Sequence, residues 1–581
     1  ISSHSIHGAK SISDFIYGFW QNYPNQDELG LSATRIPLLI VSSILQAIIP
    51  TFILQKIEIF LIFFLAMWSM YSLVQTNSIW PRYFAAFFYA INPFVYLRFM
   101  AGHWLILLAY ALLPFFVKEL LQEKKRIVPI VLWLSGLLVL SLHVFVIAFA
   151  LLFFFFRKDE FRKYGIILLC FLVLNLYWII PLALASSTTL SGISIEDAIA
   201  YETNQTFSSL LISVAMLYGF WREQAYLLPN LLFALALFAI LLWIIIHGSV
   251  HSNNPFKKRF IIIGIGAYIL ALGSSFPLVK DLFIGFFSNV PFMEGFRESH
   301  KFTMLLALSY SYLGALGLDE LKSKKIKAAL IALPFIFTPF IFFGFFGQLD
   351  PIDYPADYYE MNDILNADQG EFNTLFMPWH LYMDFSWVEN DDRRIANPST
   401  MFFEKPIIRG DNAEVGGIYS SSANPISNYI VSHLNGTAKD LQILNVKYIL
   451  VAKEFNQNIG DATLVKETKN LKLFRSNAQS SLFMQTDDFN EFLPLGYKKI
   501  NPIKYEIEEP QKKFIVFARS RNEAWQLDGQ KPMRNQPVNV YQKTDARTIT
   551  FVKAKYFFAG YVISVFAVVS LIHFRKNEFL N

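Results

Sequence analysis

Residues 227–248, LLPNLLFALALFAILLWIIIHG, decide the class of this protein, and they contain no Asp, Glu, Lys or Arg. An α-helix of about 20 apolar residues crosses the hydrocarbon core of a bilayer. A helix also satisfies its own backbone hydrogen bonds, as a lipid environment requires. This stretch therefore predicts a membrane-spanning helix.

Comparable apolar stretches recur along the chain. They cover residues 36–54, 58–75, 83–97, 104–121, 164–184, 260–276, 303–320, 328–347 and 556–574. A further stretch, 127–156, is too long for one span and has basic clusters on both sides. This arrangement predicts a pair of short helices that turns near His143. The pattern predicts a polytopic α-helical membrane protein with about 11–13 membrane helices.

The composition agrees with this class. Of the 581 residues, 54% are hydrophobic and 16% are charged, which is too apolar for a soluble globular protein. The net charge of +5 is small for this length, and its basic residues form short clusters between apolar runs, so nucleic-acid binding is not expected. Cys170 is the only cysteine, which excludes an intrachain disulfide and a multi-cysteine metal site.

The basic clusters at 257–259, 322–327 and 575–576 predict the orientation, because such clusters favour the cytoplasmic side. The segments 185–226, 277–302 and 350–550 are then extracytoplasmic, and the C-terminus is cytoplasmic. The chain begins at Ile1 without a methionine, so we expect an upstream membrane helix to be missing and residues 1–35 to form the first outer loop. Residues 36–54 then either span the membrane or lie in its outer interface, and we prefer the second.

Residues 350–550 differ from the apolar body at 36–349. Charged residues are more frequent, and short runs such as 444–451, 471–474, 513–518 and 538–541 have the composition of strands. We expect an extracytoplasmic soluble domain, either mixed α/β or β-rich, with its own core. Residues 551–581 would form a final membrane helix and a cytoplasmic tail.

Two motifs carry a resemblance to a known class. Residues 89–104, YAINPFVYLRFMAGHW, and 295–302, GFRESHKF, resemble loops of GT-C membrane glycosyltransferases. The likeness is to the large arabinofuranosyltransferase-like proteins of actinobacteria and their archaeal relatives. Ser299 stands where that pattern has proline, and the segments 446–451 and 518–525 are also similar to proteins assigned to this class.

The resemblance implies a glycosyltransferase of the cell envelope in a multi-pass cell-membrane protein. It would transfer a sugar from a polyprenyl-phosphate donor to a glycan, lipid or protein acceptor on the extracytoplasmic face. The donor phosphate needs cationic groups near the membrane surface. The candidates are Arg297, His300, Lys301, Arg98 and His103. The structural alternatives are that Arg98 extends towards the interface, Arg297 pairs with Glu298 and the histidines line a packed loop.

The same resemblance implies a carboxylate in the first outer loop, either as a base or as a ligand of a divalent cation such as Mg²⁺, Mn²⁺ or Ca²⁺. Residues 1–35 offer Asp27, Glu28 and Asp14. Asp14 also fits a helix N-terminus, and Asp27 and Glu28 also fit a solvated turn. The base could instead precede Ile1, and the sequence does not identify metal ligands.

A function without catalysis stays open. The chain could be a membrane scaffold or assembly component that presents the 350–550 domain as a binding module, with membrane lipids as its other contacts. The absence of an evident catalytic carboxylate favours this alternative. A transporter is less favoured, because the sequence shows no pairing of similar halves.

Overall fold

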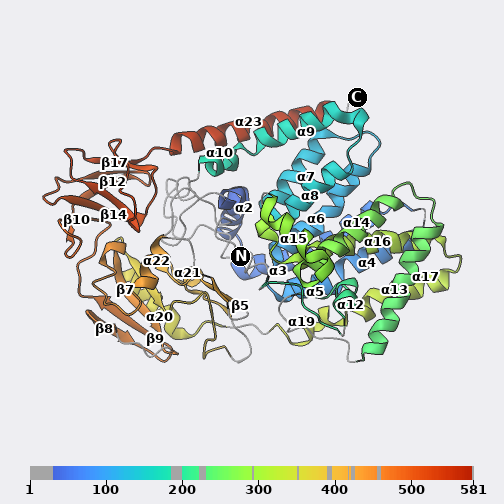
Figure 1. Cartoon of the computed structure of the whole chain (residues 1–581), viewed down its shortest axis with the longest axis horizontal. Coiled ribbons are helices and arrows are strands. Elements are labelled where there is room, and N and C mark those ends of the chain that lie inside the picture. Colours follow the sequence, from blue (N-terminus) through green and yellow to red (C-terminus); the bar gives the residue numbers. More distant parts are fainter. Residues whose placement is uncertain are drawn as a thin grey trace. The chain divides into compact units, whose positions relative to one another are not determined.

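The computed structural model describes residues 31–76, 78–184, 199, 201–207, 209–220, 230–290, 293–349, 353–388, 395–415, 418–420, 425–454 and 459–578. The chain forms two compact units (Figure 1). The helical unit comprises Leu45–Asn175, Ile193–Asp350 and Ile563–Asn581, and the strand-containing unit comprises Ile1–Ile44, Leu176–Gly192 and Pro351–Val562.

Apolar helices make up the helical unit. Its described helices are α3 (Thr51–Leu73), α4 (Ile79–Ala90), α5 (Pro93–Met100), α6 (Trp104–Leu121), α7 (Ile127–Leu140), α8 (Leu142–Phe154), α9 (Phe161–Leu174), α12 (Leu210–Ala215), α13 (Leu231–His251), α14 (Lys257–Leu272), α15 (Pro277–Asn289), α16 (Thr303–Glu320), α17 (Lys324–Ile331), α18 (Leu333–Phe337) and α19 (Phe343–Phe346). The C-terminal helix α23 (Ala554–Glu578) follows the strands of the other unit.

Six helices in the described part of the chain are long and apolar enough to cross a membrane. They are Thr51–Leu73, Trp104–Leu121, Leu231–His251, Lys257–Ser275, Ser299–Glu320 and Ala554–His573. The bent pair Lys158–Leu174 and Leu176–Leu184 makes seven if it counts as one span. This confirms a polytopic membrane protein with a final apolar helix. Fewer helices pass this test than the 11–13 predicted, because several apolar stretches are divided into shorter helices.

The divisions have identifiable causes. The predicted span 83–97 is interrupted at Asn92, whose side chain caps α5 by accepting from the Val95 N–H at 3.1 Å. The predicted span 328–347 is wrong as a single helix: it is split into α17, α18 and α19, with Pro334 and Pro339 at helix starts. The stretch 36–54, for which an interfacial position was preferred, is not a single helix: α2 (Ile36–Gln46) ends early and α3 begins at Thr51.

Other predictions hold. The helices α6 and α16 have the predicted bounds 104–121 and 303–320. The stretch 127–156 is the predicted helix pair, α7 and α8, with the break at Ser141, two residues before His143. The Ser141 side chain accepts a hydrogen bond from the Val144 N–H at 3.4 Å, which helps to start α8.

Helices α13 and α16 pack with their backbones in close contact (Figure 1). A methyl group added at Gly248 would overlap the Leu313 carbonyl and the Gly317 backbone, and one added at Gly317 would overlap the Ile244 carbonyl. Small residues at such crossings are typical of helix pairs in membranes, where close van der Waals contact drives association. This contact fixes α16, which carries part of the candidate site at its N-terminus.

The strand-containing unit has an α/β part and a β-sandwich, which confirms the predicted strand-rich domain. In the α/β part the sheet order is β4-β1-β7-β9-β8, with strands β1 (Asn373–Met377), β4 (Ile407–Ile408), β7 (Val446–Ala452), β8 (Ala462–Glu467) and β9 (Leu471–Ser476). Strands β4, β1 and β7 are parallel. Side chains of α20 (Ala356–Ala367) and α22 (Pro425–Ser432) belong to different core clusters of this part.

The β-sandwich follows in the chain. One antiparallel sheet has the order β11-β10-β14-β16 and the other β12-β13-β17-β15. The bounds are β10 (Phe483–Thr486), β11 (Leu493–Pro494), β12 (Tyr497–Asn501), β13 (Lys504–Ile507), β14 (Phe514–Ser520), β15 (Trp525–Leu527), β16 (Val538–Gln542) and β17 (Thr548–Phe551). Aromatic contacts such as Phe517 with Trp525, at 5.0 Å between ring centroids, join the sheets.

We predict that Gly248→Ala and Gly317→Ala each lower the free energy of unfolding by about 1–3 kcal/mol, because the added methyl groups force the α13 and α16 backbones apart. The measurement is the unfolding midpoint of the purified protein in mixed detergent micelles. Gly266→Ala is the matched control, since an added methyl at this helical position on α14 meets no atom within 4 Å. If Gly248→Ala and Gly317→Ala lower the free energy of unfolding no more than Gly266→Ala does, the close contact does not limit stability.

Candidate active site

The first part of the site is built by the turn between α4 and α5. Asn92 caps α5 through its side-chain oxygen, and its amide donates to the Phe88 and Tyr89 carbonyls, both at 2.9 Å. Tyr89 and Tyr110 each donate a hydroxyl hydrogen bond to the other's backbone carbonyl at 2.8 Å. This buried network holds the short helix that carries Arg98.

The second part is the segment that leads into α16. Residues Ser299–Phe302 form a 3-10 helix directly before Thr303, and Glu298, His300 and Lys301 are all buried. Two segments of the helical unit, 98–103 and 298–301, thus meet although they lie about 200 residues apart in the sequence.

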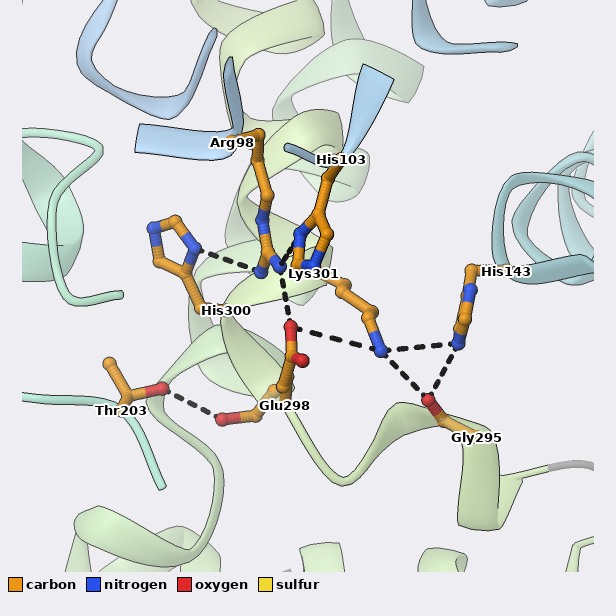
Figure 2. A network of polar contacts seen from close by, with 9 residues as sticks. Arg98, His103, His143, Thr203, Gly295, Glu298, His300 and Lys301 are labelled. Carbon is orange, nitrogen blue, oxygen red and sulfur yellow. Dashed lines mark hydrogen bonds and ion pairs between the residues drawn. The ribbon is translucent and has the colours of Figure 1, made fainter. Parts of the chain in front are cut away.

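Arg98 is the centre of a buried polar network (Figure 2). Its side chain is fully buried, and its Nη1 donates to Glu298 Oε2 at 2.5 Å and to His103 Nδ1 at 3.1 Å. Its Nη2 donates to His300 Nδ1 at 3.2 Å. Because a guanidinium only donates, both Nδ1 atoms are acceptors, and both histidines are neutral with the proton on Nε2. Phe220 packs on this guanidinium, with its ring centre 4.6 Å from Cζ.

Lys301 extends the network towards α8. Its Nζ lies 3.8 Å from Glu298 Oε2, donates to the Gly295 carbonyl at 2.9 Å and lies 3.1 Å from His143 Nε2 (Figure 2). His143 Nε2 is also 2.8 Å from the Gly295 oxygen. This nitrogen either accepts from Lys301 or donates to Gly295, and His143 helps to position the ammonium in the tautomer that accepts. We call Arg98, His103, His143, Glu298, His300 and Lys301 the Arg98 cluster.

Ser299 connects the cluster to the end of α14. Its Oγ lies 2.7 Å from Thr203 Oγ1 and donates to the Ala271 carbonyl at 3.3 Å. A methyl group at Gly273, where φ is +54°, would overlap this serine hydroxyl. The serine that replaces the proline of the resembling motif therefore makes specific polar contacts.

Arg297 is half-buried and contacts an aromatic ring. Its guanidinium lies over the Tyr201 ring, 4.2 Å from the ring centre. The expected Arg297–Glu298 pair is wrong, because the carboxylate is engaged by Arg98 and Lys301. Arg297 is still close enough to Lys301 to repel it electrostatically.

The charges of the cluster do not cancel. Among its described side chains, Arg98 and Lys301 are cationic and Glu298 is the single carboxylate. Burial by itself would raise the pKa of Glu298, but Lys301 and Arg98 outweigh it and hold this pKa well below the usual value. Burial, together with Arg98, lowers the pKa of His103 to about 4, so this histidine is neutral at pH 7. The cluster therefore carries a surplus positive charge.

Sequence reasoning found part of this site. It predicted Arg98, His103, His300 and Lys301 as phosphate ligands, and the structure brings these four together. The alternative that Arg98 extends towards the interface is wrong, since Arg98 is fully buried. Glu298 was considered only as a partner of Arg297 and His143 only as a turn residue. A carboxylate in the same short motif as the candidates Arg297, His300 and Lys301 was the signal for Glu298.

Asp14, Asp27 and Glu28 lie outside the described residues, so their predicted catalytic role stays a prediction. Among the residues that the structure does describe, no group of three or more His, Cys, Asp and Glu side chains is placed to hold a metal ion. The Arg98 cluster does not suit a divalent cation, because its carboxylate already binds two cationic side chains. A cation, if one takes part, would need ligands from outside this cluster.

The fold and the site define a multi-pass membrane protein with a buried, positively charged cluster beside the ends of its helices. No protein-family model and no curated protein sequence matches the chain. Two solved cryo-EM structures are similar, both of the arabinofuranosyltransferase AftD from Mycobacteria. The first has a TM-score of 0.48 and 12% identity over 73% of this chain and 34% of that chain. The second, a mutant form, has a TM-score of 0.46, 11% identity and coverages of 73% and 35%. The chain thus spans about a third of the length of that enzyme.

We predict that Glu298→Gln lowers the free energy of unfolding by about 3–5 kcal/mol, because it leaves buried Arg98 and Lys301 without a counter-charge. The measurement is SDS-induced unfolding in mixed micelles at pH 7. The stabilisation by Glu298 is complete above its usual pKa of 4.5 and is lost as the pH falls through its lowered folded-state pKa. The variant should lack this acid-dependent loss.

Glu320→Gln is the matched control, because Glu320 is exposed at the other end of α16 and should change stability by less than about 0.5 kcal/mol. In the double variant Arg98→Met with Glu298→Leu, the loss should be smaller than in Glu298→Gln alone. Equal effects of the Glu298 and Glu320 substitutions would contradict the role of the ion pair.

Proposed function

We propose that the chain is a GT-C-like membrane glycosyltransferase that takes its sugar from a polyprenyl-phosphate donor on the extracytoplasmic face. The observation that carries this proposal is the surplus positive charge of the Arg98 cluster, next to apolar helices. A buried cation without a counter-charge is costly, and a lipid-linked phosphate would supply that charge at the membrane. The resemblance of residues 89–104 and 295–302 to GT-C loops supports the same assignment.

The residues of the Arg98 cluster and the neighbouring Arg297 have two different roles. Arg98 is fully buried and His300 nearly so, and both are engaged inside the network, so we assign them to positioning Glu298 and the 298–301 segment. Arg297 and His103 are only half-buried, and Lys301, although buried, carries the surplus charge because Glu298 lies closer to Arg98. We assign direct contact with the donor phosphate to Arg297, Lys301 and His103.

The reaction needs a group that accepts a proton. The acceptor hydroxyl oxygen attacks the anomeric carbon of the sugar, the bond from that carbon to the phosphate oxygen breaks, and polyprenyl phosphate leaves. The hydroxyl proton passes to a carboxylate, for which Asp27, Glu28 and Asp14 are our candidates. Glu298 is a poor base, because its two cationic partners lower its pKa. The cationic cluster stabilises the charge that develops on the departing phosphate.

The scaffold alternative has one observation in its favour. The polar groups of the Arg98 cluster bind mainly to one another, as expected of a network that joins helices without binding a ligand. In that case the strand-containing unit would be the functional part, as a binding module. The two functions differ in whether the chain binds polyprenyl phosphate.

We predict that Lys301→Gln and Arg297→Gln each weaken polyprenyl phosphate binding about 10-fold or more, because each removes a hydrogen bond to a charged group. Binding is measured by native mass spectrometry of the full chain in detergent. Lys322→Gln is the matched control, because Lys322 follows the opposite end of α16. Unchanged affinity in both variants would contradict the proposed donor site.

A transfer assay tests catalysis separately. The full chain is supplied with radiolabelled pentose and hexose polyprenyl phosphates and with envelope glycans as acceptors. Asp14, Asp27 and Glu28 are each replaced by the corresponding amide. Replacement of the one that acts as the base should reduce transfer about 10²–10⁴-fold and leave donor binding unchanged. Absence of both binding and transfer in the unaltered chain would support the scaffold.

A further inference from the structure

The helix α15 (Pro277–Asn289) lies in the sequence between α14 and the 298–301 segment of the Arg98 cluster. Its 13 residues give a length of about 20 Å, whereas the hydrocarbon core of a bilayer is about 30 Å thick. A single apolar helix of this length is typical of a buried core helix or of an interfacial segment.

One stripe of α15 packs inside the helical unit. Val279, Phe283 and Phe287, spaced four residues apart, are buried. The ring of Phe283 lies near the point where Gly273 approaches Ser299, so this stripe is anchored next to the Arg98 cluster. The helix is therefore fixed on one side and is not a loosely attached segment.

A neighbouring stripe of α15 is apolar and exposed. Leu278, Leu282, Phe286 and Val290 follow one another at intervals of four residues, and their exposed fractions are 87%, 52%, 41% and 39%. Residues four apart lie along one face of a helix. Lys280, Asp281 and Ser288 are also exposed but lie outside this stripe, whereas exposed Asn289 lies on the side of Leu282, at the end of the helix just before Val290. The helix thus has a packed stripe, an exposed apolar stripe and a polar side.

The exposed stripe follows directly after a helix that could span the membrane. On α14, one of the six candidate spans, Ile262, Ile265 and Ile269 are exposed at helical spacing. Helix α15 starts five residues after α14 ends, so its apolar stripe follows the α14 stripe at one end of that span. The occupant that fits a stripe of Leu, Phe and Val beside that span is therefore the acyl chains of the bilayer.

We propose that α15 is an interfacial helix whose Leu278–Leu282–Phe286–Val290 stripe inserts into the acyl-chain region of the lipid layer. Its polar side, with Asp281 and Ser288, faces the headgroups and water. This insertion sets the depth of the 293–301 segment relative to the membrane surface. The inference does not depend on sugar transfer, because it holds equally for an enzyme and for a scaffold.

The experiment uses the full chain with Cys170→Ala, which removes the only cysteine. Single cysteines at Leu278 and Leu282 carry a nitroxide spin label in vesicles of phosphatidylcholine and phosphatidylglycerol. Their collision rates with oxygen, which partitions into acyl chains, and with a water-soluble nickel complex are then compared. Ile262→Cys is the lipid-facing control, and Asp281→Cys and Ser288→Cys are the polar-side controls.

We expect the labels at Leu278 and Leu282 to collide several-fold more with oxygen than with nickel, as at Ile262, and the polar-side labels to show the reverse. Nickel collisions at Leu278 equal to those at Asp281 would overturn the proposal, because the stripe would then face water. Low collision rates with both reagents would also overturn it, since another part of a protein would cover the stripe. Leu278 is 87% exposed, so its substitution leaves the packing intact.

Discussion

The buried ion pair between Arg98 and Glu298 is the interaction on which the site depends. It joins residues 200 positions apart at 2.5 Å, with 0% and 10% of their side chains exposed. Neither charge is tolerable there alone, because removal from water costs several kcal/mol per ion. Glu298 also binds Lys301, and Arg98 also binds His103 and His300. The pair therefore specifies how the α5 end and the α16 start come together.

The helices that deliver these residues are held by two other constraints. Asn92 stops α4 and starts α5, so a stretch that is apolar enough to continue as one helix turns instead and presents Arg98 inward. At the other side, Gly248 and Gly317 allow α13 and α16 to touch through their backbones. In a bilayer, where apolar side chains gain little by leaving lipid, such close contact is a main source of helix association.

The sequence predicted the features that depend on local composition. Helices α6 and α16 have their predicted bounds because each is a single apolar run without an interrupting cap. Strands β7 and β9 were recognisable from the short apolar runs 444–451 and 471–474 in a more polar segment. The breaks at Asn92 and in 328–347 were missed, because hydropathy records apolar length but not a side-chain cap or a proline-determined helix start. The partner of Glu298 was missed for a different reason: Arg297 is adjacent in sequence, whereas Arg98 becomes adjacent only through the fold.

The surplus charge also explains why the histidines matter. Arg98 needs acceptors besides Glu298, and neutral His103 and His300 supply their Nδ1 lone pairs without adding a second negative charge. Two carboxylates in their place would, together with Glu298, outnumber the two cations and make the cluster negative. Because burial and the nearby Arg98 keep His103 neutral at pH 7, its Nδ1 lone pair stays available to Arg98. Histidine at these two positions therefore satisfies the buried arginine and leaves the surplus positive charge of the cluster in place.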